Sequence, residues 1–203
     1  RVMFAIPWHG HTLVGTTDTP VAEATPEPVA MEEEIEFILH TASLYLAKAP
    51  ARRDVLSVFA GIRPLVRQGE GGRTASLSRD HTIRIEDSGM VTIAGGKWTT
   101  YRHMAEDCVN QAATLARLQG RPCATAELKI HGYHPGAAEF GHLSVYGSDA
   151  RSVRELMAGA KGRGARLHAA LPYTGAEVVW AVREEMARTV EDVLARRTRA
   201  LFL

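Results

Sequence analysis

One stretch of the chain combines residue types that can hold an anion. Residues 91–102 carry a short apolar strand, then Gly95, Gly96, Lys97, Thr99 and Thr100, and then the start of a predicted helix. The glycines allow a sharp turn and a close approach, and a threonine can cap the helix. A helix N-terminus presents unpaired backbone N–H groups and a positive dipole end, to which Lys97 adds a full charge. An ordinary strand-to-helix turn without a ligand is the alternative.

Two arginines precede this stretch. Arg63 lies in an apolar, β-prone segment, residues 55–66, which predicts a buried strand. Because a buried charge is costly unless it is paired, Arg63 should meet either an internal carboxylate or a bound anion. Arg79 either forms a surface ion pair with Asp80 or Glu86, or joins Arg63 on a phosphate. Guanidinium groups suit that second role because they form paired hydrogen bonds with phosphate oxygens.

Histidine pairs do not predict a metal site. His9 and His11 lie two residues apart in a turn, and His131 and His134 lie in another turn. Neither pair has further ligands at a suitable spacing, so we interpret all four as loop residues.

Two hairpins and a series of helices must position these residues. The hairpins are predicted over residues 2–6 with 12–15 and over residues 82–85 with 91–94. Helices are predicted over residues 31–49, 101–118, 137–146, a segment capped by Ser148, 175–187 and 189–203. Thr189 and Asp192 resemble the two ends of a capping box.

Composition excludes several classes of protein. The 203 residues carry a net charge of +1, so binding of nucleic acid through a broad basic field is not expected. No stretch approaches the roughly 20 apolar residues of a membrane-spanning helix. Cys108 and Cys123 are isolated, which fits a reducing compartment. The chain begins inside a predicted strand rather than in a signal peptide, so we expect a piece of a longer protein.

Several stretches, in order, resemble the FAD-dependent, quinone-linked glycerol-3-phosphate dehydrogenases. They are residues 4–8 leading to 15–19, then 59–66, 78–82 and 91–102. Residues 180–189 and 194–199 are similar to the final helical domain of the same family. The resemblance covers nearly the whole chain and implies the C-terminal half of such an enzyme.

The resemblance implies an activity. The family oxidises sn-glycerol 3-phosphate to dihydroxyacetone phosphate, with hydride transfer to FAD and electron transfer to a quinone. Arg63 and Arg79 would bind the substrate phosphate, and Lys97 would act catalytically beside the pyrimidine edge of the flavin. The expected cofactor contacts are Gly61, Ile62, Gly95, Gly96, Lys97, Thr99 and Thr100. The family's catalytic histidine is expected upstream of this chain, so His9, His11 and His81 receive no such role.

The predicted architecture is α+β. Residues 1–80 would be the C-terminal part of a substrate domain built on an antiparallel sheet. Residues 81–119 would close an FAD-binding domain, and residues 120–203 would form a helical domain. No G-x-G-x-x-G motif is present, so the isolated chain is expected to bind FAD poorly and to be inactive.

Alternatives to this reading are a glycerol-3-phosphate oxidase that uses oxygen and a non-enzymatic helical module for docking or dimerisation. A cytoplasmic protein, peripheral to the inner membrane, is the expected setting, and a homodimer is compatible with it.

Overall fold

The computed structural model describes residues 3–63, 65–66 and 80–203, beginning with an antiparallel hairpin. Strand β1 (Phe4–Trp8) pairs with β2 (His11–Gly15) through a two-residue turn. His9 and Gly10 have φ values of 48° and 78°, and positive φ at both turn residues matches the right-handed twist of the strands. The first predicted hairpin is therefore confirmed.

Helix α1 (Glu32–Ser43) follows a proline-rich link and ends earlier than predicted. Glu34 closes its first turn by accepting a hydrogen bond from the Met31 N–H at 3.1 Å. The prediction extended this helix to residue 49, but Leu44 and Tyr45 are exposed and add no packing that would prolong it.

The second hairpin is also confirmed. Strands β3 (His81–Ile85) and β4 (Val91–Gly95) pair antiparallel, and a 3₁₀ turn, η3 (Trp98–Thr100), leads into helix α2 (Tyr101–Leu115). Gly95 and Gly96 have φ values of 77° and 80°, so the chain reverses between strand and helix through two left-handed residues. We call residues 95–97 the glycine corner.

The glycine corner is closely packed by the chain itself. A Cβ on Gly95 would lie 2.9 Å from the Asp80 carbonyl oxygen. A Cβ on Gly96 would lie 2.6 Å from Met104 Cε and 3.4 Å from His81 Cβ. Absence of a side chain at both positions thus lets β4 and α2 approach β3 closely.

Helices dominate the remainder of the chain. They are η4 (Ala137–Asp149), α3 (Ala150–Ala158), α4 (Gly175–Arg183), a short π-helix η5 (Asp192–Arg197) and a 3₁₀ turn η6 (Ala200–Phe202). A further 3₁₀ turn, η1 (Arg52–Asp54), lies earlier in the chain. The main buried cluster joins η4, α3 and α4, and its members are Phe140, Leu143, Ala150, Val153 and Ala176. A second cluster links α4 to η5 and contains Ala181, Ala187 and Val193.

A buried carboxylate organises the helical part. Glu177, 1% exposed, accepts hydrogen bonds from the Thr174 N–H at 2.7 Å and from the Tyr146 hydroxyl at 3.2 Å. His142 Nε2 lies 3.7 Å from the same carboxylate. Burial raises the pKa of Tyr146, so its hydroxyl stays a donor. Glu177 therefore caps α4 and ties it to η4.

Besides the length of α1, three further expectations about elements were wrong. Residues 55–63 form no strand; they run irregularly, and residues 56–63 are all exposed. Asp149, rather than Ser148, is the N-cap of α3. The final predicted helix is broken into η5 and η6 by Arg199, whose φ of 59° is left-handed. The capping box of Thr189 and Asp192 is confirmed by reciprocal hydrogen bonds of 3.1 and 2.9 Å.

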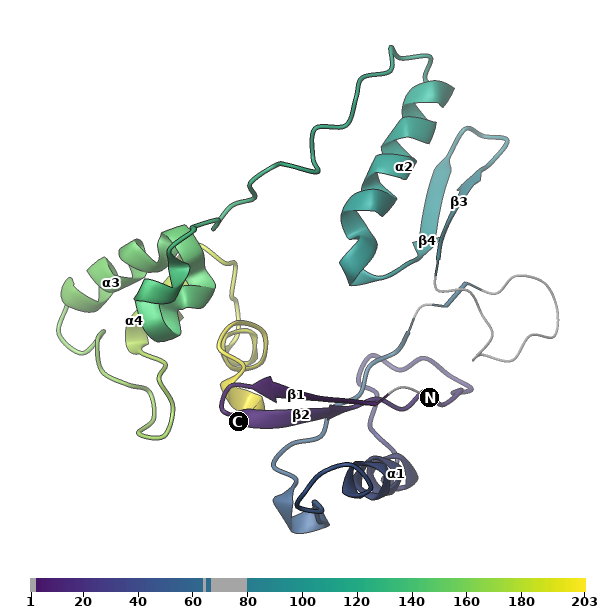
Figure 1. Ribbon diagram of the computed structural model, residues 1–203. Coiled ribbons are helices and arrows are strands. Elements are labelled where there is room, and N and C mark those ends of the chain that lie inside the picture. The colour runs from purple at the N-terminus through teal and green to yellow at the C-terminus, as the bar shows by residue number, and fades with distance from the viewer. Residues whose placement is uncertain (1–2, 64, 67–79) are drawn as a thin grey trace.

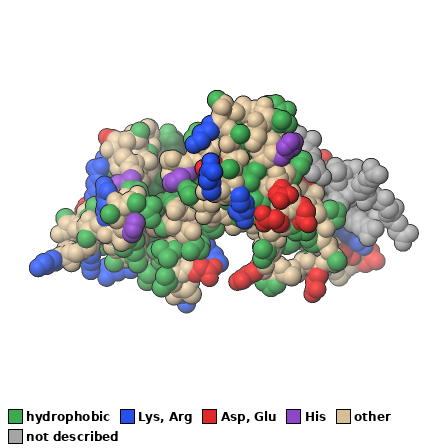
Figure 2. Space-filling view, turned by 90° about the horizontal axis from the view of Figure 1, so that it is seen from below, with side chains coloured by type: hydrophobic (Ala, Val, Ile, Leu, Met, Phe, Trp, Pro, Cys, Tyr) green, Lys and Arg blue, Asp and Glu red, His purple; other side chains and the backbone are tan. Residues whose placement is uncertain are grey.

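The elements form three groups in space (Figure 1). Hairpin β1–β2 and α1 lie together, β3, β4 and α2 form a second group, and α3 and α4 form a third, reached through the extended residues 116–136. The C-terminal residues return to the turn of hairpin β1–β2. Figure 2 shows hydrophobic side chains spread over one face among charged ones. Among the described residues, no helix combines the length and apolar character needed to cross a membrane. The α+β class is confirmed.

Leu143→Ala should lower the free energy of unfolding by about 2–5 kcal/mol, because Leu143 is 2% exposed in the main cluster and truncation leaves a cavity. Val145→Ala, 77% exposed on the same element, is the matched control and should change it by less than about 0.5 kcal/mol. Urea denaturation measures both, and equal effects would contradict the assigned core.

Gly96→Ala should be more destabilising than Gly89→Ala. Both glycines have positive φ, but a Cβ on Gly89 meets nothing within 4 Å, so it reports the backbone cost alone, about 1–2 kcal/mol. The double variant Gly96→Ala/Met104→Ala removes the steric clash while keeping that backbone cost. In thermal denaturation, the double variant should therefore be more stable than the sum of the two single effects predicts. Simple additivity would contradict the packing of Met104 on Gly96.

Candidate functional site

Arg63 lies on the exposed segment between η1 and β3, and the structure supplies it with a carboxylate. Its Nη1 lies 3.6 Å from Asp18 Oδ2, and its Nη2 donates to Thr16 Oγ1 at 3.1 Å. The side chain is 38% exposed, so the predicted burial is wrong, and of the two partners that the sequence left open, a carboxylate is present. A guanidinium has five N–H groups, and these two contacts leave donors that can bind an anion.

The segment that holds Arg63 is itself fixed by α1. Thr17 and Thr19, on either side of Asp18, donate hydrogen bonds to Glu34 Oε1 at 2.7 and 2.6 Å. These two hydroxyls lower the pKa of Glu34, so the carboxylate remains ionised as their acceptor. Asp18 is thereby held at the end of β2 where it can orient Arg63.

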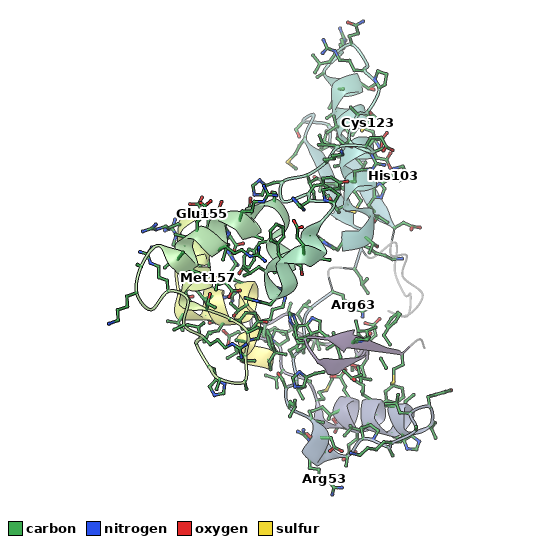
Figure 3. The ribbon with its side chains drawn as sticks, turned by 60° about the vertical axis from the view of Figure 1, so that its left-hand side comes forward. Arg53, Arg63, His103, Cys123, Glu155 and Met157 are labelled. Atoms are coloured by element: carbon green, nitrogen blue, oxygen red, sulfur yellow. The ribbon has the colours of Figure 1, made fainter. Side chains whose placement is uncertain are left out.

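The chain brings the Arg63 segment next to the glycine corner. Val66 Cγ2 lies 3.1 Å from the position that a Cβ on Gly95 would occupy. Arg63 is three residues before Val66, and Lys97 is two residues after Gly95. Figures 1 and 3 agree, because the end of the β3–β4–α2 group where β4 passes to α2 faces the part of the chain that carries Arg63.

Lys97 and the threonines lie at the start of the helix and are exposed. The Thr100 hydroxyl donates to the Lys97 carbonyl at 3.1 Å and accepts from the Lys97 N–H at 3.3 Å. Thr100 therefore occupies the N-cap position of α2 but bonds backward to Lys97 rather than to the helix. Trp98, 84% exposed, stacks on Tyr101 with ring centroids 5.2 Å apart. The first turn thus presents an ammonium, a hydroxyl and an aromatic pair to the surroundings.

One interaction beside the corner has no counterpart in the sequence analysis. His81 Nε2 lies 2.9 Å from Asp107 Oδ2 and joins β3 to the middle of α2. His81 and Asp107 lie 26 residues apart in the sequence, and no local spacing indicates such a pair. One turn earlier in α2, the Arg102 guanidinium hydrogen-bonds Glu106 at 2.6 Å and holds the pKa of that carboxyl below its usual value.

Other predicted residues lie as follows. Gly61 and Ile62 are exposed on the same irregular segment as Arg63. Arg79 lies outside the described residues, so its approach to Arg63 stays a prediction. His9 and His131 contact Tyr173 and Asp149, respectively. Across the ranges that the structure describes, no group of three or more His, Cys, Asp or Glu side chains is arranged to hold a metal ion.

Comparison with known proteins identifies related chains. The protein-family model described as the C-terminal domain of alpha-glycerophosphate oxidase matches residues 90–203. The mitochondrial glycerol-3-phosphate dehydrogenase of Homo sapiens is 41% identical over all of this chain and 31% of its own length. That of Arabidopsis thaliana is 39% identical over all of this chain and 37% of its own length.

The chain spans about a third of the length of these curated relatives, and the family match covers more than half of the chain. The chain therefore belongs to the family defined by the C-terminal domain of alpha-glycerophosphate oxidase.

Proposed function

We propose that this chain is the C-terminal part of a flavoenzyme that oxidises sn-glycerol 3-phosphate to dihydroxyacetone phosphate. The observation that carries the proposal is the packing of Val66 on Gly95, which brings the segment of a tethered, partly exposed arginine to the glycine corner before α2. The glycerol-3-phosphate dehydrogenases that match over the whole chain support the same substrate.

Arg63 is proposed to bind the phosphate of the substrate together with Arg79. Its contacts with Thr16 and Asp18 restrict the rotation of a long side chain, which lowers the entropy lost when the phosphate binds. Asp18 also balances the charge of Arg63 when no phosphate is present. The donors that remain on the guanidinium can then form charge-assisted hydrogen bonds with phosphate oxygens.

The donor set at the glycine corner fits the electron-rich edge of a flavin. The N–H groups in the first turn of a helix have no partner within that helix, and here Lys97 and Thr99 lie exposed beside them. We propose that residues 95–100, with Gly61 and Ile62, contact FAD, which when bound supplies the redox chemistry by accepting a hydride. Lys97 would stabilise the negative charge that develops at the pyrimidine edge, and Thr99 and Thr100 would donate to or accept from nearby oxygens.

The proposal also covers the electron acceptor and the membrane attachment of the full-length protein. Electrons would pass to a quinone, and the enzyme would attach peripherally to the inner membrane from the cytoplasmic side. These features rest on the resemblance stated above. Sedimentation of the full-length protein with membranes, and its release by high salt, tests the attachment.

An oxidase that passes electrons to oxygen is the second candidate, because the matching family model is described by a glycerophosphate oxidase. Oxygen consumption by the full-length enzyme distinguishes the two. The dehydrogenase consumes little oxygen with glycerol 3-phosphate alone and reduces an added quinone analogue, whereas an oxidase releases hydrogen peroxide without the quinone.

The isolated 203-residue chain should purify without FAD and show no turnover, because it lacks a G-x-G-x-x-G pyrophosphate-binding turn. Its visible absorption spectrum measures this directly. A yellow sample with one flavin per chain would contradict the proposal that this chain supplies only part of the FAD site.

Arg63→Ala in the full-length enzyme should raise the KM for glycerol 3-phosphate about 10- to 100-fold, because hydrogen bonds from a charged donor are lost. Bound FAD, measured by absorbance, should be retained. Arg53→Ala is the matched control, since Arg53 is an exposed arginine on η1, well separated from Arg63 in Figure 3. An unchanged KM for the Arg63 variant would reject its role in substrate binding.

A further inference from the structure

Three aromatic rings join segments that are far apart in the sequence. Phe202 of η6 lies between Phe59 and Trp8, with ring centroids 5.2 and 6.5 Å from its own. Both separations fall within the range in which aromatic pairs attract. We call Trp8, Phe59 and Phe202 the aromatic junction.

The aromatic junction lies on the segment that carries Arg63. Phe59 precedes Arg63 by four residues, and residues 56–63 are all exposed and irregular. A segment without ladder hydrogen bonds or burial has little to restrict its conformation. Its position therefore depends on the contacts that Phe59 and Arg63 make with other parts of the chain.

Two residues of this segment, Phe59 and Arg63, are connected to the same hairpin, Phe59 through Phe202 and Arg63 through the residues that follow β2. Phe59 packs on Phe202, which packs on Trp8 at the end of β1. Arg63 is held by Thr16, which directly follows β2, and by Asp18, two residues further on. The contacts thus form a closed circuit, from the hairpin through Phe202 and Phe59 to Arg63 and back to the hairpin.

The C-terminal turn that carries Phe202 is anchored to the helical part of the chain. The Thr198 hydroxyl, in a residue 2% exposed, donates to the Val193 carbonyl at 2.9 Å and accepts from the Ala200 N–H at 3.3 Å. Tyr173, immediately before the N-cap of α4, contacts His9 beside Trp8 with its hydroxyl 3.3 Å from Nδ1. Both contacts connect the junction to the buried helical part.

We infer that Phe202 is a positioning residue for substrate binding, acting through Phe59 to hold Arg63 where it meets the phosphate. This inference rests on the proposed function, and it assigns to the helical C-terminal part a role in the affinity for the substrate. Because Phe202 would act through its contact with Phe59, its loss should affect the binding of phosphate rather than the chemical step.

The test uses the full-length enzyme and the variants Phe202→Ala, Phe59→Ala and the double variant. Each single variant should raise the KM for glycerol 3-phosphate, and the inhibition constant of inorganic phosphate, about two- to tenfold. The kcat and the FAD content should stay at the wild-type values. Because both rings act through one contact, the double variant should match the single variants instead of multiplying their effects. Phe202→Tyr, which keeps the ring, should restore the wild-type KM.

Leu201→Ala is the matched control, since Leu201 is the exposed neighbour of Phe202 in the same turn. A readout independent of turnover is chymotryptic cleavage after Phe59, mapped by mass spectrometry, which should be faster in Phe202→Ala because the segment is released. If Phe202→Ala fails to fold, the exposed Phe59→Ala carries the same test.

Unchanged KM in Phe59→Ala, multiplicative effects in the double variant, or loss of FAD with the KM unchanged would each overturn the inference. Failure of the proposed function is separate, because it is seen as a wild-type enzyme that does not oxidise glycerol 3-phosphate. An enzyme in which Arg63→Ala raises the KM while both phenylalanine variants leave it unchanged would retain the proposed function and reject only the inference.

Discussion

The backbone reversal at Gly95 and Gly96 is the constraint on which the candidate site depends. Both residues are left-handed, and each would bring a Cβ into contact with Asp80, His81 or Met104. With the reversal in place, the first turn of α2 begins directly beside the end of β4. Lys97 then lies between the strand and the helix, two residues from the point where Val66 brings in the Arg63 segment. An L-residue with a side chain cannot reproduce this geometry without strain.

A second constraint acts on Arg63, through the residues that follow β2. Glu34 fixes the hydroxyls of Thr17 and Thr19, and Asp18 between them orients Arg63. Each of these contacts is exposed or only partly buried, so none contributes much to stability alone. Their effect is to limit the orientations of one guanidinium. The two constraints are built from different parts of the chain, and the contact of Val66 with Gly95 connects them.

The sequence predicts the elements that depend on local signals. Both hairpins and α2 could be located, because strand alternation, turn glycines and helical periodicity act over a few residues. The prediction of a buried strand over residues 55–63 was wrong. Apolar and β-branched residues indicate that a segment could be buried in a sheet, but they do not indicate whether a neighbouring strand is present to pair with it. The position of Lys97 beside two glycines could be predicted. The partners Asp18 of Arg63 and Asp107 of His81 could not be identified, because they are set by tertiary packing over 45 and 26 residues.

Glu177 has a consequence for how the molecule opens. Its carboxylate binds Thr174 and Tyr146, and the surrounding cluster contains Leu143 and Val153, which with Glu177 are the largest fully buried side chains of the described residues. The two hairpins lack comparable cover, since most of their residues are exposed or half-buried. Amide protons in α3 and α4 should consequently exchange with deuterium only through large-scale opening, while those of the hairpins exchange through local fluctuations. The helical part would then be the last cooperative unit to lose its structure under mild denaturation.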